Sequence, residues 1–191
     1  MENHYLLYAL KKIAILCISE SHSDNDQIIK LNSLYGPNLH FLHSHDPLNP
    51  RSKGIVIVMN KNNIKSPPSN IHIISPGRTI NFDINWPENK KLNISAIYAP
   101  NAPNNNTELW NKILTSIENG TTMKPDIIIG DFNMVEDATD RLPPHPDPPL
   151  ITEALTNLKT KLNLTDGWHC SNPPQTEASP SNNHQEAADQ E

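Results

Sequence analysis

The sequence lacks the features that mark secreted and membrane proteins. It has only 2 cysteines, Cys17 and Cys170, in 191 residues, so a disulfide framework is not expected and a reducing compartment is the simplest inference. No stretch is long and apolar enough to span a bilayer, and Met1 does not open the basic and then apolar layout of a secretory signal. We therefore expect an intracellular protein, cytoplasmic or nuclear, that is not secreted and does not enter a membrane.

Basic residues are also scarce. The 15 lysines and arginines stand against 21 aspartates and glutamates, which gives a net charge of −6 at pH 7. Proteins that coat nucleic acid use lysine and arginine to neutralise phosphates, so the composition argues against that class. A site acting on phosphodiesters remains open, because a bound divalent cation can supply positive charge locally. The hydrophobic share of 36% favours one globular domain with a polar remainder.

Short apolar runs predict the strands. Their ranges are 13–18, a weak one around Phe41, 54–59, 71–74, 79–86, 92–98 and 127–129. The continuous runs 13–18 and 127–129 are typical of buried strands. In the range 79–86, Asn81, Asp83 and Asn85 alternate with apolar residues, which predicts a strand buried on one face only.

Helical periodicity predicts the end of a helix at 5–10, a helix from an Asp24 cap to Gly36, one from a Thr107 cap to Gly120, and one over 151–162. Pro143–Pro149 is expected to be a stiff loop, and the polar residues from Ser171 onward are expected to be disordered. Helices and strands are interleaved, but many strands adjoin one another directly. We therefore expect an α+β fold with a mixed sheet or a two-sheet sandwich and outer helices.

Polar residues stand at the ends of three predicted strands. Asp131 and Asn133 follow one strand, Tyr98 and Asn101 end another, and Glu20 follows a third. Buried acidic side chains are rare unless they are paired or hold a metal, so Asp131 and Glu20 are candidate site residues. Ordinary interpretations stay open beside this one. Asp131 and Asn133 also suit a turn, Glu20 suits a surface position, and Tyr98 suits half-buried packing.

A histidine cluster, His40, His43 and His45, offers a separate zinc hypothesis, because two of these residues would share one face of a strand. No cysteine or carboxylate with the spacing of a zinc site accompanies them, so a solvated loop is the favoured interpretation.

In this order, the strand ends resemble those of the endonuclease/exonuclease/phosphatase superfamily, the fold of AP endonucleases and deoxyribonuclease I. Within it, the chain is most similar to the endonuclease domain of fungal non-LTR (LINE-type) retrotransposons. The resemblance covers about Ile13 to Trp168. The segments that carry it are Ile15–His22, Ser52–Val58, Ile97–Asn101, Ile129–Arg141 and Asp166–Trp168.

The resemblance implies a four-layer α/β-sandwich, in which two mixed sheets are flanked by helices, and a phosphodiesterase that depends on Mg²⁺, with Mn²⁺ as the alternative ion. Glu20 resembles the glutamate that ligates the metal. Asp131 resembles the aspartate at the metal site that orients or activates the attacking water. Mg²⁺ retains several waters, so one or two carboxylates suffice to hold it.

Further roles are implied for residues near the phosphate. Asn133 resembles a residue that hydrogen-bonds the scissile phosphate, and Tyr98 resembles the tyrosine that lines the phosphate site. Asn101 matches a position that shapes the adjacent loop, and Arg141 matches a family position after Asp140. Asn101 and Arg141 are counted with the substrate-binding residues.

The sequence departs from the family pattern at both ends. The family has a strand bearing a metal-site asparagine before the first helix, and it ends with an Asp-His pair whose histidine engages the phosphate. No Asp-His dipeptide occurs in this sequence. We therefore expect a truncated, incomplete domain over residues 1–170 and a disordered polar tail over 171–191. Weak or absent activity is expected, because groups that act as a unit lose activity steeply when one is removed.

The resemblance implies DNA as the ancestral substrate and a reverse transcriptase as a partner in the parent element. Two alternatives stay open. The chain could be a non-catalytic remnant or interaction fragment that binds a partner through open sheet edges. It could also be a phosphatase for small phosphoesters or lipids, although the Asp140-Arg141 context disfavours this. The sequence does not indicate an oligomeric state.

Overall fold

The computed structural model describes residues 12–88 and 90–171, and these residues form two β-sheets with flanking helices. One sheet has the strand order β1-β3-β2, with β1 at Ile15–Ser19, β2 at Leu39–His45 and β3 at Gly54–Asn60. The other has the order β4-β5-β6-β7, at Ser69–His72, Thr79–Trp86, Lys90–Tyr98 and Ile127–Asp131. The helices are α2 (Asn25–Tyr35), α3 (Pro103–Glu118), α4 (Pro149–Leu162) and α5 (Gly167–Ser171), with a 3-10 turn η1 at Ala138–Asp140.

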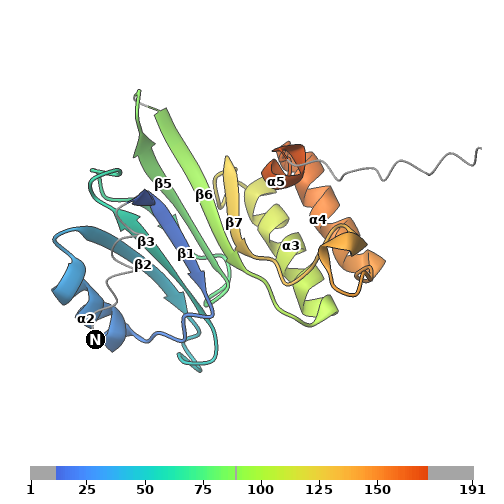
Figure 1. Ribbon diagram of the computed structural model, residues 1–191, viewed down its shortest axis with the longest axis horizontal. Coiled ribbons are helices and arrows are strands. Elements are labelled where there is room, and N and C mark those ends of the chain that lie inside the picture. Colours follow the sequence, from blue (N-terminus) through green and yellow to red (C-terminus); the bar gives the residue numbers. More distant parts are fainter. Residues whose placement is uncertain (1–11, 89, 172–191) are drawn as a thin grey trace, which may run out of the picture.

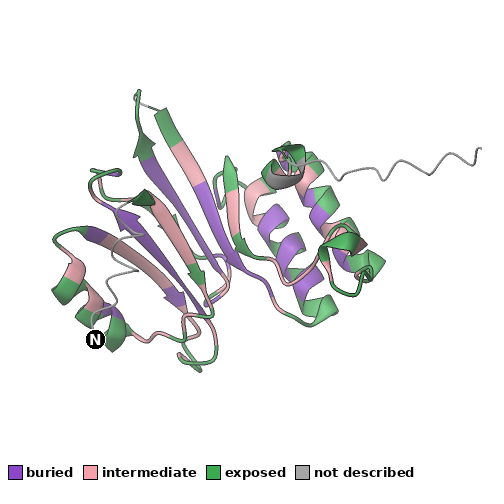
Figure 2. Cartoon of the chain, in the orientation of Figure 1, coloured by how far each residue is buried: buried purple, intermediate pink, exposed green. Residues whose placement is uncertain are grey.

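The two sheets stack face to face, with α2 outside one sheet and α3 and α4 outside the other (Figure 1). Ile57 and Phe82 belong to the apolar core between the sheets. Val58 packs in the cluster under α2, and Trp110 packs in the cluster between α3, α4 and the second sheet. Buried residues accordingly follow the facing strands and the inner sides of α3 and α4 (Figure 2). This order of layers confirms the predicted α+β sandwich.

Helix α2 forms where local signals predict it. The Asp24 carboxylate accepts the backbone N–H of Gln27 at 3.0 Å, and the Gln27 side chain accepts the N–H of Asp24 at 3.0 Å, which is a capping box. The predicted helix end at 5–10 lies outside the described residues, as does the predicted tail beyond residue 171. Ser171 itself is the last residue of α5.

Two helix starts differ from the prediction. Helix α3 begins at Pro103, ahead of the predicted cap Thr107, which is buried inside the helix. Helix α4 begins at Pro149, the last residue of the predicted stiff loop. Proline suits the first helical turn, because its missing N–H has no partner there in any case. Within residues 12–88 and 90–171, no helix has the length and apolar character needed to cross a membrane.

Three predictions of strand burial are wrong. Strand β5 is buried from Thr79 to Ile84 on both faces, because the segment before β7 covers the polar face that alternation assigned to water. Strands β1 and β7 are edge strands of the described sheets, and they are less buried than their apolar runs predicted. Ile127, for example, is 40% exposed. A run of apolar residues indicates that both faces of a strand can be packed. It does not indicate whether the strand has a neighbouring strand on each side.

The two cysteines are free and lie in different environments. Cys17 is half-buried in β1, and this burial raises the pKa of its thiol to about 11. Cys170 is exposed in α5.

Gly130 lies near the end of β7, where the parallel β6–β7 ladder places it opposite Ile97. Its φ of +133° lies in a region that side chains rarely adopt, and an added Cβ would lie 1.9 Å from the carbonyl oxygen of Ile97. Only glycine therefore allows the two strands to approach so closely immediately before Asp131.

Replacing Gly130 with alanine is expected to lower the free energy of unfolding by about 3 kcal/mol or more, because backbone strain and a backbone clash add. Gly120→Ala is the matched control, since Gly120 has a φ of +69° but a Cβ there meets nothing within 4 Å. Its expected cost is about 1 kcal/mol. Urea unfolding measures both, and equal losses would contradict the packing role of Gly130.

Candidate active site where strands β1, β6 and β7 end

Glu20 and Tyr98 meet at one end of the sandwich although they are far apart in the sequence. The Tyr98 hydroxyl donates a 2.6 Å hydrogen bond to Oε1 of Glu20. Tyr98 ends β6 and is 6% exposed, whereas Glu20 follows β1 and is exposed. Glu20 has a φ of +50°, a strained value for a residue that is not glycine. Such strain is concentrated at functional sites, so this contact is a site candidate on geometric grounds.

Asp131 lies beside Tyr98, because these residues are partners in the β6–β7 ladder. Ile129, two residues earlier, packs against the core between the sheets, so Asp131 leaves the same face of β7. Strands β1 and β7 are also neighbours across the sandwich. The structure therefore brings Glu20, Tyr98 and Asp131 to one rim.

Asn133 is fixed against the same rim. One Asp131 carboxylate oxygen accepts the backbone N–H of Asn133 at 2.9 Å, and the Asn133 side-chain amide donates to the carbonyl of Ala99 at 2.7 Å. Asn133 has a φ of +50°. An amide group carries two N–H donors, so this contact leaves one donor of Asn133 for another acceptor.

Arg78 is part of this site, and the sequence analysis missed it. Its guanidinium carbon lies 4.4 Å from the centre of the Tyr98 ring, a cation–π contact. Its Nη1 also donates to the carbonyls of Tyr98 and Ala99, each at 3.2 Å. The sequence gives no signal for this role beyond a basic residue after the turn at Gly77.

Asn106 on α3 ties the two loops of the site together and was also missed. It is fully buried, and its side-chain N–H groups reach the carbonyls of Pro100 and Phe132, each at 2.9 Å. Asn101, which was predicted to shape this loop, is exposed. The asparagine-rich composition hid Asn106 among similar residues.

Arg141 is anchored within its own loop. It forms a 2.8 Å ion pair with Asp147 and lies 3.1 Å from Nε2 of His145. Asp147 also accepts the backbone N–H of Val135 at 2.7 Å. The predicted contact of Arg141 with substrate stays a prediction.

Within the described residues, no group of three or more His, Cys, Asp or Glu side chains is placed to hold a metal ion. The rim therefore offers a pair of carboxylates, Glu20 and Asp131. The histidine cluster lies on strand β2 and is half-buried, so the favoured solvated loop is wrong. His43 and His45 stack at 5.1 Å, and burial, together with the neighbouring His45, lowers the pKa of His43.

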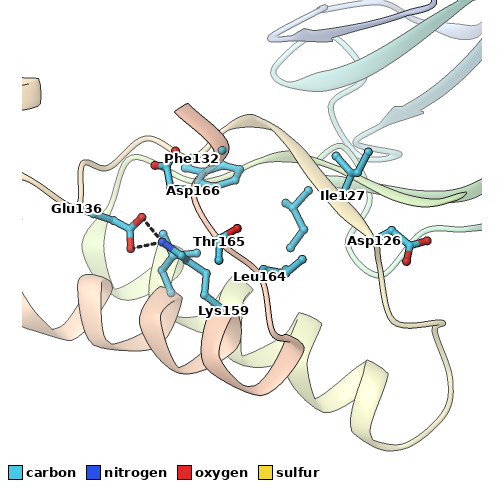
Figure 3. A pocket seen from close by; sticks show the side chains of 11 residues that line it. Asp126, Ile127, Phe132, Glu136, Lys159, Leu164, Thr165 and Asp166 are labelled. Carbon is cyan, nitrogen blue, oxygen red and sulfur yellow. Dashed lines mark hydrogen bonds and ion pairs between the residues drawn. The ribbon is translucent and has the colours of Figure 1, made fainter. Parts of the chain in front are cut away.

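A cavity of ≈380 Å³ opens on the other side of β7, beside α4. Ile128, Phe132 and Leu155 give it apolar walls, and an ion pair of 2.6 Å joins Lys159 to Glu136 at its margin (Figure 3). Neither Glu20 nor Asp131 lines this cavity, so it is separate from the rim.

Tyr98 should titrate at higher pH than an ordinary tyrosine. Burial raises the pKa of Tyr98 above 10.0, the hydrogen bond and negative charge of Glu20 raise it further, and Arg78 opposes both. The stability that comes from the neutral hydroxyl is therefore present below pH 10 and is lost as the pH rises through the raised pKa. The phenolate absorbance difference between wild type and Tyr98→Phe should have its midpoint above pH 10, and a lower midpoint would contradict this environment.

No protein-family model and no curated protein matches the chain. Among solved structures, it is similar to an AP endonuclease from Leishmania major, with a TM-score of 0.66 and 12% identity over 88% of this chain and 63% of that one. The catalytic domain of Xenopus laevis APE2 gives 0.54 and 14% identity, over 80% of this chain and 61% of that one. A conserved Enterococcus faecalis protein of unknown function gives a TM-score of 0.53 and 10% identity, over 79% of this chain and 61% of that one. The chain thus spans less than two thirds of these structures, and it has the fold of the AP endonucleases.

Proposed function

We propose that the rim of Glu20, Tyr98 and Asp131 is a metal-dependent phosphodiesterase site that acts on DNA. The observation that carries this proposal is the contact between Tyr98 and Glu20 beside Asp131, which assembles polar groups from distant segments at one rim. The likeness in fold to AP endonucleases supports the same chemistry.

The donor set suits a hard divalent cation. Both carboxylates are exposed, and Mg²⁺ or Mn²⁺ prefers oxygen ligands, with one or two carboxylates and several waters sufficing for Mg²⁺. Glu20 would hold the ion, with Asp131 as the second carboxylate of the site. When bound, the cation neutralises charge that develops on the phosphoryl oxygens. This local charge is needed because the chain as a whole carries a charge of −6.

The contacts of each rim residue indicate a different role in the proposed reaction. Tyr98 and the ring-stacked Arg78 fix the position of the Glu20 carboxylate. Asp131 orients a water for in-line attack on phosphorus and accepts its proton. The P–O bond opposite the water breaks, and the leaving oxygen takes a proton from solvent water. The remaining N–H donor of Asn133 stabilises a phosphoryl oxygen without reorganising.

Turnover should be slow. The residues resembling the family's site lack an Asp-His pair, since this dipeptide does not occur in the sequence. Removing one member of a group that acts as a unit costs most of its activity. We therefore infer a partial nuclease domain of weak activity, and a folded chain without any metal-dependent cleavage would instead favour a non-catalytic interaction fragment.

Plasmid nicking in Mg²⁺, Mn²⁺ or EDTA tests this function, with and without abasic sites in the plasmid. Wild type should nick slowly in Mg²⁺ and not in EDTA. Asp131→Asn and Glu20→Gln should each lower the rate by about 100-fold or more, and Tyr98→Phe by about 10-fold. Glu153→Gln, which changes an exposed acid on α4, is the control. If Asp131→Asn nicks as fast as wild type, the proposed site is wrong.

We further propose an origin in a LINE-type retrotransposon, with the chain acting inside the cell beside a reverse transcriptase. The segment from Ile129 to Arg141 supports this through its resemblance to that group of endonucleases. Genomic sequence downstream of the coding region should then encode a reverse transcriptase. Unrelated single-copy genes on both sides would argue against this origin and leave the phosphodiesterase proposal untouched.

A further inference from the structure

A polar stripe crosses the outer face of the four-stranded sheet. Asn81 and Asp83 lie two residues apart on β5, so their side chains share one face, opposite the face of Phe82 in the inter-sheet core. On β6, Ser95 is the ladder partner of Asn81, and Asn93 is the partner of Asp83. We call these four residues the β5–β6 polar stripe. Such a stripe is unusual, because interior faces of sheets are ordinarily apolar.

Three residues of the stripe, Asn81, Asp83 and Asn93, line a cavity of ≈260 Å³ under the segment that leads into β7. Asn70 of β4 lies at one side of this cavity, and Thr122, Met123 and Pro125 cover it. Its volume exceeds that of a single water several-fold, so it has room for an ion with some of its hydration shell.

Asp83 is buried, and within residues 12–88 and 90–171 no lysine or arginine forms an ion pair with it. It is 3% exposed, and the hydrogen bond it receives from a described side chain comes from the neutral amide of Asn70. Buried charges in proteins are normally paired with an opposite charge or coordinate a metal ion. The neutral amide of Asn70 cannot neutralise a carboxylate, and no described residue forms an ion pair with Asp83.

Two buried amide oxygens beside Asp83 also lack a hydrogen-bond partner. Asn81 is 6% exposed, donates its NH₂ group to Ser95, and leaves Oδ1 buried and unpaired. Asn93 points its NH₂ group at the Asp126 carboxylate, 3.3 Å away, which fixes the amide orientation, and its Oδ1 is buried and unpaired. The residues that line the cavity therefore include one carboxylate and two asparagines whose buried Oδ1 atoms lack a hydrogen-bond partner, together with His72.

We propose that this cavity is a Ca²⁺ site whose protein ligands are Asp83, Asn81 and Asn93. Carboxylate and asparagine oxygens are ligands that Ca²⁺ accepts in flexible geometry, with water completing six to eight positions. Mg²⁺ demands a near-ideal octahedron and gives up its water reluctantly, and Zn²⁺ sites are built mainly from several Cys and His ligands, whereas this lining has one histidine, His72. With one carboxylate among these ligands, the dissociation constant should be about 10⁻⁴–10⁻³ M.

The Ca²⁺ site does not depend on the proposed function. Asn93 lies on β6 five residues before Tyr98, which is about 16 Å along a strand. The stripe also lies on the face of the sheet that the segment before β7 covers, whereas Tyr98 faces the core between the sheets. An ion here would join β5 to β6 on the face that the segment before β7 covers.

Calorimetric titration with CaCl₂ tests the site. A background of Glu20→Gln and Asp131→Asn removes both carboxylates of the rim, so that binding there cannot be mistaken for binding at the stripe. Saturable binding of about one Ca²⁺ per chain is expected, with Mg²⁺ at least tenfold weaker. The midpoint temperature of thermal unfolding should be roughly 2–6 °C higher in 10 mM CaCl₂ than in EDTA.

Two further variants place the ion. Asp83→Asn keeps the shape of the side chain and should weaken Ca²⁺ binding tenfold or more. Asn81→Asp adds a second carboxylate and should tighten binding about tenfold, which remains measurable even if Asp83→Asn does not fold. Binding that is unchanged in Asp83→Asn would overturn the site. The site would also be overturned if neither the background chain nor Asn81→Asp showed saturable binding. That result would mean that the cavity holds water only.

Discussion

The parallel pairing of β6 with β7 is the interaction on which the rest of the candidate site depends. It sets Tyr98 beside Asp131, and it is possible at this spacing because Gly130 has no side chain to meet the carbonyl of Ile97. Helix α3 makes the crossover that parallel strands require, and its buried Asn106 fastens the loop that follows β6 to the loop that follows β7. The site is thus positioned by backbone geometry before any side chain acts.

The contact between Tyr98 and Glu20 then joins the two sheets at their rim. Tyr98 belongs to the four-stranded sheet, and Glu20 follows a strand of the other. A hydrogen bond across the sandwich keeps these segments in register where the layers would otherwise be free to separate. Arg78 supports it by stacking on a face of the Tyr98 ring. This explains why a strained φ at Glu20 is retained, since the neighbouring contacts determine its position.

Local signals predicted much of the fold. Apolar runs located β3 and β6, and the Asp24 cap located α2, because these features depend on neighbours in the sequence. The candidate residues Glu20, Tyr98 and Asp131 were found because strand ends place polar groups at a rim. Arg78 and Asn106 could not be found in this way. Their partners are an aromatic ring and backbone carbonyls, which only the folded chain brings near them. The burial of both faces of β5 could not be predicted for the same reason, since the segment that covers its polar face is distant in the sequence.

The contrast between the two thiols has a practical consequence for following this molecule in solution. With a pKa of about 11, Cys17 holds almost no thiolate at neutral pH, while Cys170 is open to solvent in α5. A maleimide dye should therefore attach at a single position without any engineered cysteine. That dye would lie on the helical side of the sandwich, away from the rim of Glu20, Tyr98 and Asp131, and its polarisation would test the proposed association with DNA.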